Sequence, residues 1–91
     1  ESASCPEGKL SAATLLKTDD KLVKILAFGA HYHLKPHQAD ADVMILILEG
    51  TANATVQGKT EALNPMDHLI FPKGEIHELT ATSDMKMLLI K

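Results

Sequence analysis

Two histidines, His37 and His77, stand forty residues apart, and each lies beside a turn and a run of strand-forming residues. His37 follows Lys35-Pro36 and precedes the apolar run Val43–Leu48, whereas His77 follows the turn residues Pro72-Lys73-Gly74. A neutral imidazole can bind a transition metal through one ring nitrogen, or it can hydrogen-bond a ligand. The pair therefore predicts a binding site if the fold brings both rings to one cavity.

Strand alternation predicts that both rings point inward. The face that His77 shares with Leu79 is apolar, so we expect it to form the interior. Counting in twos from His37 reaches Val43 and Ile45, which are also apolar, after a polar loop that could reset the count. An imidazole buried without a bonding partner costs about 1–3 kcal/mol. The predicted ligand-binding residues are His37, His77, Val43, Ile45 and Leu79.

The elements that must position these residues are patterned as short strands. Ala52–Gln57 alternates apolar and polar residues, as a half-buried strand does. Gln57-Gly58-Lys59 is typical of a hairpin turn, and Asn64-Pro65-Met66-Asp67 places proline in its favoured second turn position. Turn signals of this kind recur every eight to ten residues, which is the rhythm of a sandwich or barrel.

The chain is accordingly predicted to be an all-β protein with one domain. No segment carries a long helical stripe, although Ser11–Leu16 could begin as a helical turn. Residues 1–9 are small and polar and are predicted to be a flexible N-terminal arm, which leaves residues 10–91 as the folded domain. A length of 91 residues is enough for one core.

Composition excludes several classes of partner. The net charge is −3, and Lys and Arg form no cluster that could follow a phosphate backbone, so no nucleic-acid partner is expected. No apolar stretch approaches the ~20 residues that cross a bilayer, so no membrane partner is expected. Cys5 is the single cysteine, which favours a reducing, cytoplasmic location. Whether a signal peptide preceded Glu1 stays open.

The run Val43–Leu48 is apolar on both faces, so both faces must lose water. One face would fill the barrel interior. The other would be covered by the N-terminal segment or by a second subunit, and we therefore expect a homodimer.

At this point the chain resembles the small, single-domain cupins, the family of the double-stranded β-helix. Their second motif reads Gly-Asp, four residues, Pro-x-Gly-x-x-His. The residues that carry the resemblance are Asp67, Pro72, Gly74 and His77 for this motif, and His37, Glu49 and Gly50 for the first motif. The resemblance covers about residues 20–90 and implies a cupin-like double-stranded β-helix, which is a small β-barrel or jelly roll.

The first metal-binding motif is degenerate. Metal-binding cupins usually present His-x-His, a Glu seven residues before the turn glycine, and the histidine of the second motif. This chain has Ala39 and Val43 at two of those positions, so that His37 and His77 alone remain as metal ligands. Met66 replaces the usual glycine of the second motif. The resemblance therefore supports the fold better than the family's ordinary metal chemistry.

The other histidines are expected at the surface. His31 and His33 form a His-x-His pair, which is a chelating pattern. The resemblance places Leu34 at the inward position, however, and so sends both histidines outward. His68 shares a face with Ile70, and a surface position is expected for it, although it could approach the pocket.

Three functions compete. The preferred one is a small-molecule-binding cupin of unassigned specificity, with the ligand in an apolar barrel mouth anchored by His37 and His77. The alternative is a metal-dependent cupin enzyme, an oxygenase or isomerase, in which these histidines bind a divalent transition metal (Fe, Mn, Ni or Zn) and Gln38, Asp42 or water completes the coordination sphere. The third is a structural dimer module with a collapsed pocket. The missing first-motif ligands favour binding over catalysis.

Overall fold

The computed structural model describes residues 10–91, and the predicted arm of residues 1–9 lies outside the described part. Strands make up all of the regular secondary structure in residues 10–91, which confirms the all-β prediction. The segment Ser11–Leu16 belongs to a strand, so the helical turn considered for it is wrong. The alanines of this segment suit a helix, but antiparallel pairing with the next strand determines its conformation.

The strands form two antiparallel sheets. The five-stranded sheet has the order β1-β2-β9-β4-β7, with β1 at Leu10–Lys17, β2 at Leu22–Phe28, β9 at Met85–Ile90, β4 at Val43–Glu49 and β7 at His68–Phe71. The four-stranded sheet has the order β3-β8-β5-β6, with β3 at His33–Gln38, β8 at Ile76–Ala81, β5 at Ala52–Val56 and β6 at Lys59–Leu63.

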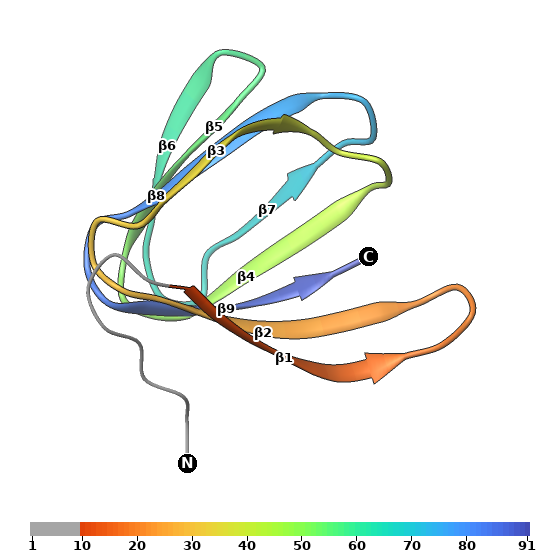
Figure 1. The fold of residues 1–91 in the computed structure, drawn as a ribbon. Helices are drawn as coiled ribbons and strands as arrows, with labels where there is room; N and C mark the ends of the chain where they lie inside the picture. Colours follow the sequence, from red (N-terminus) through yellow and green to blue (C-terminus); the bar gives the residue numbers. More distant parts are fainter. Residues whose placement is uncertain (1–9) are drawn as a thin grey trace.

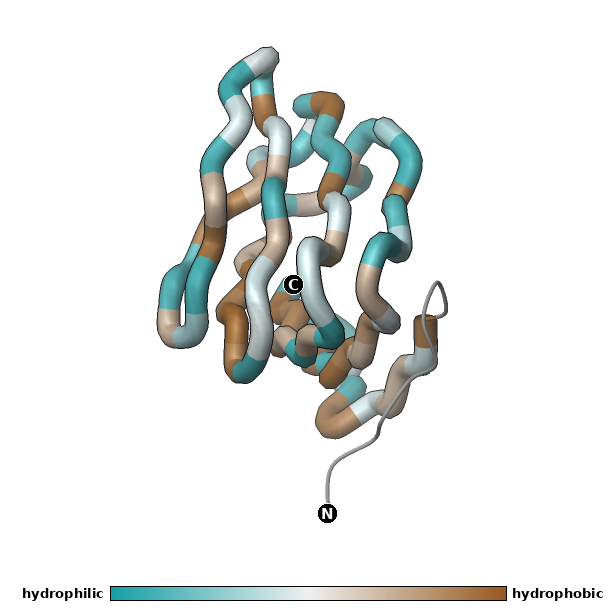
Figure 2. The backbone as a smooth tube through the Cα atoms, turned by 90° about the vertical axis from the view of Figure 1, so that its left-hand side faces the viewer, coloured by the Kyte–Doolittle hydropathy of each residue, from teal (hydrophilic) through white to brown (hydrophobic). Residues whose placement is uncertain are grey.

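The two sheets face each other, and most connections pass from one sheet to the other (Figure 1). Hydrophobic and hydrophilic residues alternate along the strands, as Figure 2 shows. Alternate side chains of a strand point to opposite faces, so the hydrophobic side chains that point inward form the core. The largest fully buried side chains are Phe28, Ile45, Ile47, Leu79 and Met87.

Gly50 sits at the crossing from β4 to β5, where only glycine fits. Its φ angle is +80°, which is in the left-handed region. A Cβ at this position would overlap the carbonyl oxygen of Asp84 and would lie 2.7 Å from the Cα of Met85. The glycine of the first motif therefore permits the close passage of the β8–β9 turn against the β4–β5 crossing.

The turn before β7 keeps its shape although it contains Met66. The Asp67 N–H donates to the Asn64 carbonyl at 2.9 Å, and Met66 has a φ of +75°. Those are the features of a type II turn, whose third residue is normally glycine. Pro65 fixes the second position of the turn, so the methionine is accommodated in a conformation that side chains disfavour.

An apolar row crosses all five strands on the outer face of the five-stranded sheet. The register aligns one row of large aliphatic side chains across it, formed by Leu16, Val23, Ile90, Met44 and Ile70. Of this row, Leu16 is 47% exposed and Ile70 is 53% exposed. β4 buries Val43, Ile45 and Ile47 on its other face, so this strand is apolar on both sides. Within residues 10–91 no helix could span a membrane.

Candidate functional site

The pairing of β3 with β8 brings the two predicted site histidines together. His37 and His77 are directly opposite in this antiparallel pair, although the register shifts between Leu34 and His37. Directly opposite residues project from the same face of a sheet. The ring centroids lie 4.1 Å apart, and the ring planes meet at 66°. Both rings line one cavity between the sheets.

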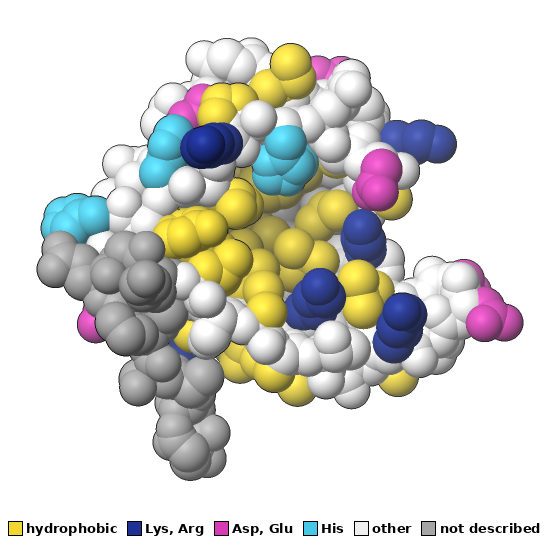
Figure 3. All heavy atoms as spheres, in the orientation of Figure 1, with side chains coloured by type: hydrophobic (Ala, Val, Ile, Leu, Met, Phe, Trp, Pro, Cys, Tyr) yellow, Lys and Arg dark blue, Asp and Glu magenta, His cyan; other side chains and the backbone are white. Residues whose placement is uncertain are grey.

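That cavity has a volume of about 320 Å³ and is mostly apolar. The histidine rings stand at its wall, and the remaining wall is largely aliphatic or aromatic. Figure 3 shows the hollow with a hydrophobic floor and a histidine on its upper rim. All five predicted ligand-binding residues line it, namely His37, His77, Val43, Ile45 and Leu79. Their role in binding stays a prediction.

A type II turn just before β8 sets the position of His77. The Glu75 N–H donates to the Pro72 carbonyl at 3.1 Å, and Gly74 takes a φ of +86°. Hydrogen bonds tie this turn to the β3–β4 loop, among them that of the Ala39 N–H to the Glu75 carbonyl at 3.3 Å. The Gly74 N–H donates to the Ala39 carbonyl at 2.8 Å, and the Lys73 N–H donates to Asp42 Oδ1 at 2.8 Å. The second motif therefore fixes His77 and the end of β3 together.

His77 is a buried polar residue, with 5% of its surface exposed. Its ring stacks on that of Phe71, with centroids 4.1 Å apart and planes inclined by 8°. Burial, followed by the positive charge of a protonated His37, lowers the pKa of His77 from its ordinary 6.5. The Glu75 carbonyl opposes this lowering, yet Nδ1 of His77 is buried and forms no hydrogen bond within residues 10–91. Burial therefore favours the neutral form of this ring.

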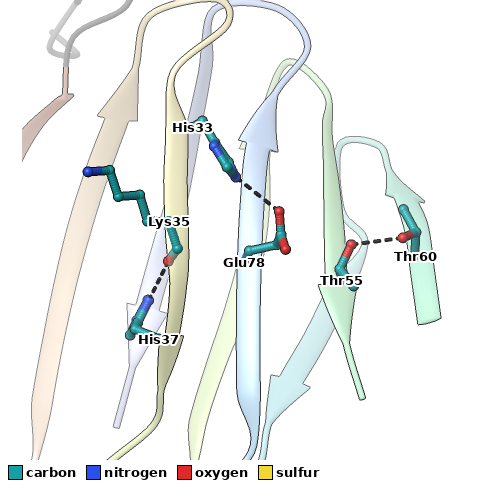
Figure 4. A network of polar contacts seen from close by, with 6 residues as sticks. All are labelled: His33, Lys35, His37, Thr55, Thr60 and Glu78. Atoms are coloured by element: carbon teal, nitrogen blue, oxygen red, sulfur yellow. Dashed lines mark hydrogen bonds and ion pairs between the residues drawn. The ribbon is translucent and has the colours of Figure 1, made fainter. Parts of the chain in front are cut away.

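His37 is exposed at the cavity rim, and its tautomer is fixed by the backbone. Its Nδ1 lies 2.9 Å from the Lys35 carbonyl oxygen (Figure 4). A carbonyl oxygen can only accept a hydrogen bond, so Nδ1 carries the proton. In the neutral ring Nε2 is then the acceptor, which is the arrangement that prepares an imidazole to bind a metal or a hydrogen-bond donor.

The structure places the other histidines away from the cavity. His33 lies on the outer side of the four-stranded sheet, where its Nε2 is 3.0 Å from Glu78 Oε2 (Figure 4). His31 is exposed in the turn before β3, and its N–H donates to the Ala81 carbonyl. His68 is exposed and lies opposite Leu46, on the outer face of the five-stranded sheet. Leu34 lines the cavity, as expected from the resemblance.

The residues available for a metal do not make a three-ligand site. Within residues 10–91 no group of three or more His, Cys, Asp or Glu side chains is placed to hold a metal ion. The side chains considered for completing the coordination sphere are engaged elsewhere. Gln38 Nε2 donates to the Gly74 carbonyl at 2.8 Å, and Asp42 Oδ1 accepts the Lys73 N–H. Firm catalytic metal sites usually take three protein ligands, so the fit is poor.

Sequence reasoning missed two features of the site. Phe71 stacks on His77, and alternation within β7 could have predicted this, because His68 and Ile70 take the outer face. Lys91 and Asp40 both line the cavity, and the Lys91 Nζ lies 3.3 Å from Asp40 Oδ1. No local pattern signals this second contact, because fifty-one residues separate its members.

Comparison with known families identifies the class of protein. The family described as Cupin domain matches residues 24–91, which is most of the chain. The chain therefore belongs to the cupin family, and the resemblance noted in the sequence is confirmed. Comparison with curated proteins gives no match.

Solved structures agree with this assignment. A cupin superfamily protein from Desulfitobacterium hafniense is 25% identical, with a TM-score of 0.91, and the match covers 98% of this chain and 82% of that one. A cupin 2 conserved barrel domain protein from Leptotrichia buccalis is 27% identical, with a TM-score of 0.88 over 97% of this chain and 43% of that one. The DMSP lyase DddQ from Ruegeria pomeroyi is 21% identical, with a TM-score of 0.81 over 89% of this chain and 45% of that one, and shows the fold alone.

Proposed function

We propose that the protein binds a small molecule in the cavity between its sheets, with His37 and His77 as polar anchors. The observation that carries the proposal is the meeting of these two imidazoles, 4.1 Å apart, on the wall of an apolar cavity of about 320 Å³. Apolar pockets with a few convergent polar groups are the usual design of small-ligand sites. A cavity of this size also argues against the collapsed pocket of the third alternative.

The two anchors offer different chemistry. His37 carries its proton on Nδ1 and accepts through Nε2 at the exposed rim. His77 lies deeper in the wall, where burial favours its neutral form and Phe71 stacks on its ring. A ligand with a polar group at the rim and an apolar body inside would match this arrangement.

The test is a thermal-shift screen with neutral fragments of about ten non-hydrogen atoms, the number that the cavity volume allows at ~30 Å³ each. Fragments that raise the melting temperature should lose this effect in Val43→Phe, which fills the cavity, and in His37→Ala, which removes the rim anchor. Met44→Phe, on the outer face of the same strand, is the matched control. Stabilisation that survives both cavity variants would overturn the proposal.

A metal-dependent enzyme, an oxygenase or isomerase, is the second candidate. It is favoured by one observation, the backbone-fixed tautomer of His37, which leaves Nε2 as a ligand atom next to His77. In this case both histidines would bind Fe, Mn, Ni or Zn, and water would complete the coordination sphere. Metal analysis after dialysis tests it. Stoichiometric metal that disappears in His37→Ala and His77→Ala, but persists in His68→Ala, would favour the enzyme.

We also propose that a second copy of the chain covers the outer face of the five-stranded sheet. Its aliphatic row is continuous over five strands. Lys86 and Glu49, which are directly opposite on this face, pair with each other at 3.6 Å. A nearly uncharged face can pair with itself about a two-fold axis. Leu88 lies opposite Leu46 on this face, and Leu88→Glu should convert a dimer to a monomer in light scattering. Ile76→Glu, an equal change at an exposed site in β8, should not.

A cytoplasmic location is part of the same proposal. The single cysteine, Cys5, is consistent with a reducing compartment. Cell fractionation of the full-length protein would test it.

A further inference from the structure

Two lysines lie on the inner face of the five-stranded sheet, one lining the cavity and one beside its lining residues. Lys91 lines the cavity itself. Lys24 of β2 is directly opposite Leu89 of β9, which is in turn opposite Ile45 of β4, and both of these apolar residues line the cavity. Directly opposite residues share a face, so Lys24 projects from the inner face of the five-stranded sheet. Figure 3 shows Lys or Arg side chains along the lower rim of the hollow, across from a histidine.

A carboxylate already occupies part of this rim. Asp40, from the loop after β3, lies 3.3 Å from Lys91 Nζ, and this contact bridges the two sides of the mouth. The side chain of Asp40 is 85% exposed and that of Lys91 is 33% exposed. Within residues 10–91 no ion pair involves Lys24. The side chains of Lys24, Lys91 and Asp40 together carry one net positive charge.

We propose that the ligand of this cavity is an amphipathic monoanion, a small carboxylate with an apolar body. The apolar body would lie against Ile45, Phe71 and Leu79, and the carboxylate would meet Lys24 and Lys91 at the mouth. This inference rests on the proposed function, because it assigns a ligand class to the same cavity. The position of Asp40 beside Lys91 marks where a carboxylate group fits.

The physical argument has two parts. An ionised group cannot enter the apolar interior without a large loss of hydration, so a ligand's charge must remain at the mouth. Exposed ion pairs contribute little to stability, so the carboxylate of a ligand can replace that of Asp40 on Lys91 at little cost. The cavity volume of about 320 Å³ corresponds to about ten non-hydrogen atoms at ~30 Å³ each. Octanoate has that size.

The experiment compares three probes of equal chain length, octanoate, 1-octanol and octylamine, by isothermal titration calorimetry. Octanoate should bind most tightly and octylamine least. Lys24→Met should weaken octanoate binding by about twofold to fivefold, as expected for one exposed charge pair, and leave 1-octanol unchanged. Asp40→Asn should strengthen octanoate binding, because Lys91 loses its internal partner. Lys59→Met, the same charge change in the β5–β6 hairpin, should have no effect.

Equal binding of 1-octanol and octanoate would overturn the anion assignment and leave ligand binding in the cavity intact. An equal loss of octanoate binding in Lys24→Met and Lys59→Met would also overturn it, because the effect would then be one of net charge. Failure of all three probes would rule out this ligand class. The proposed function itself fails only if the neutral fragments also fail to depend on Val43 and His37.

Discussion

Phe71 and His77 lie ring upon ring, 4.1 Å between centroids and 8° from parallel, and they come from different sheets. Phe71 ends β7 of the five-stranded sheet, and His77 stands in β8 of the four-stranded sheet. The stack therefore joins the sheets at the cavity wall. Because Nδ1 of His77 forms no hydrogen bond within residues 10–91, aromatic packing is what orients this ring.

Replacing Phe71 by leucine should destabilise the protein by about 1–2 kcal/mol, through lost volume and lost stacking on His77. Urea denaturation would measure the change. Ile70→Leu is the neighbouring control, since Ile70 is 53% exposed on the outer face and should cost less than about 0.5 kcal/mol. Equal costs for the two variants would mean that the stack contributes nothing.

The pKa of His77, lowered by burial and then by the charge of His37, should make stability depend on pH. The unfolded chain, with the ordinary pKa of 6.5, binds a proton at a higher pH than the folded chain does. Stability should therefore be complete above pH 6.5 and should decrease as the pH falls below it, by at most about 1.4 kcal/mol per pH unit from this group.

Denaturation at pH 7.5 and at pH 5 would test this dependence, with His77→Leu compared to the wild type. The variant should lose less stability on acidification. His68→Leu, on the outer face of β7, should retain the wild-type dependence. A wild-type dependence in His77→Leu, or stability that rises as the pH falls, would contradict the assignment of the buried neutral ring.

The side chains that point into the cavity could be predicted from the sequence, because the alternation of side chains along a strand is a local property. His77 and Leu79 share a face by their spacing alone, and both are buried in β8. The charged rim was not predictable, because Lys91 and Asp40 meet only when the end of β9 approaches the β3–β4 loop. Such a contact depends on the closure of both sheets, and no local pattern in the sequence encodes it.

In β1, local helix propensity misleads, because pairing with a neighbouring strand determines the conformation. Ser11–Leu16 contains Ala12 and Ala13, which are favourable in helices, but the segment pairs with β2 from Leu10 to Lys17. Pairing at the edge of the sheet satisfies its backbone on one side, and this tertiary constraint exceeds a propensity difference of a few tenths of a kcal/mol per residue. The cupin resemblance began at about residue 20 and so did not cover the strand.

Gly50→Ala should be strongly destabilising, by about 3 kcal/mol or more, because left-handed strain adds to backbone overlap. The added Cβ would overlap the Asp84 carbonyl oxygen. Gly58→Ala is a matched control, since its φ of +78° is similar but nothing lies within 4 Å of the point that its added Cβ would occupy. It should cost about 1–2 kcal/mol, from strain alone. Similar values for both variants would show that the β4–β5 crossing can move aside.

Met66→Gly should stabilise the protein, although it shortens a side chain. Met66 holds a φ of +75° in a type II turn, a conformation that costs a side chain about 1–2 kcal/mol and costs glycine almost nothing. The greater entropy of the unfolded glycine variant offsets about 0.5–1 kcal/mol of this effect. The free energy of unfolding is therefore expected to increase by about 0.5–1 kcal/mol. The lost side chain adds little to this balance, because Met66 is 71% exposed. Met66→Ala keeps the strain and should change the free energy of unfolding by less than about 0.5 kcal/mol. If urea denaturation gives the same value for the glycine and alanine variants, backbone strain is not what separates Met66 from the glycine that cupins usually have there.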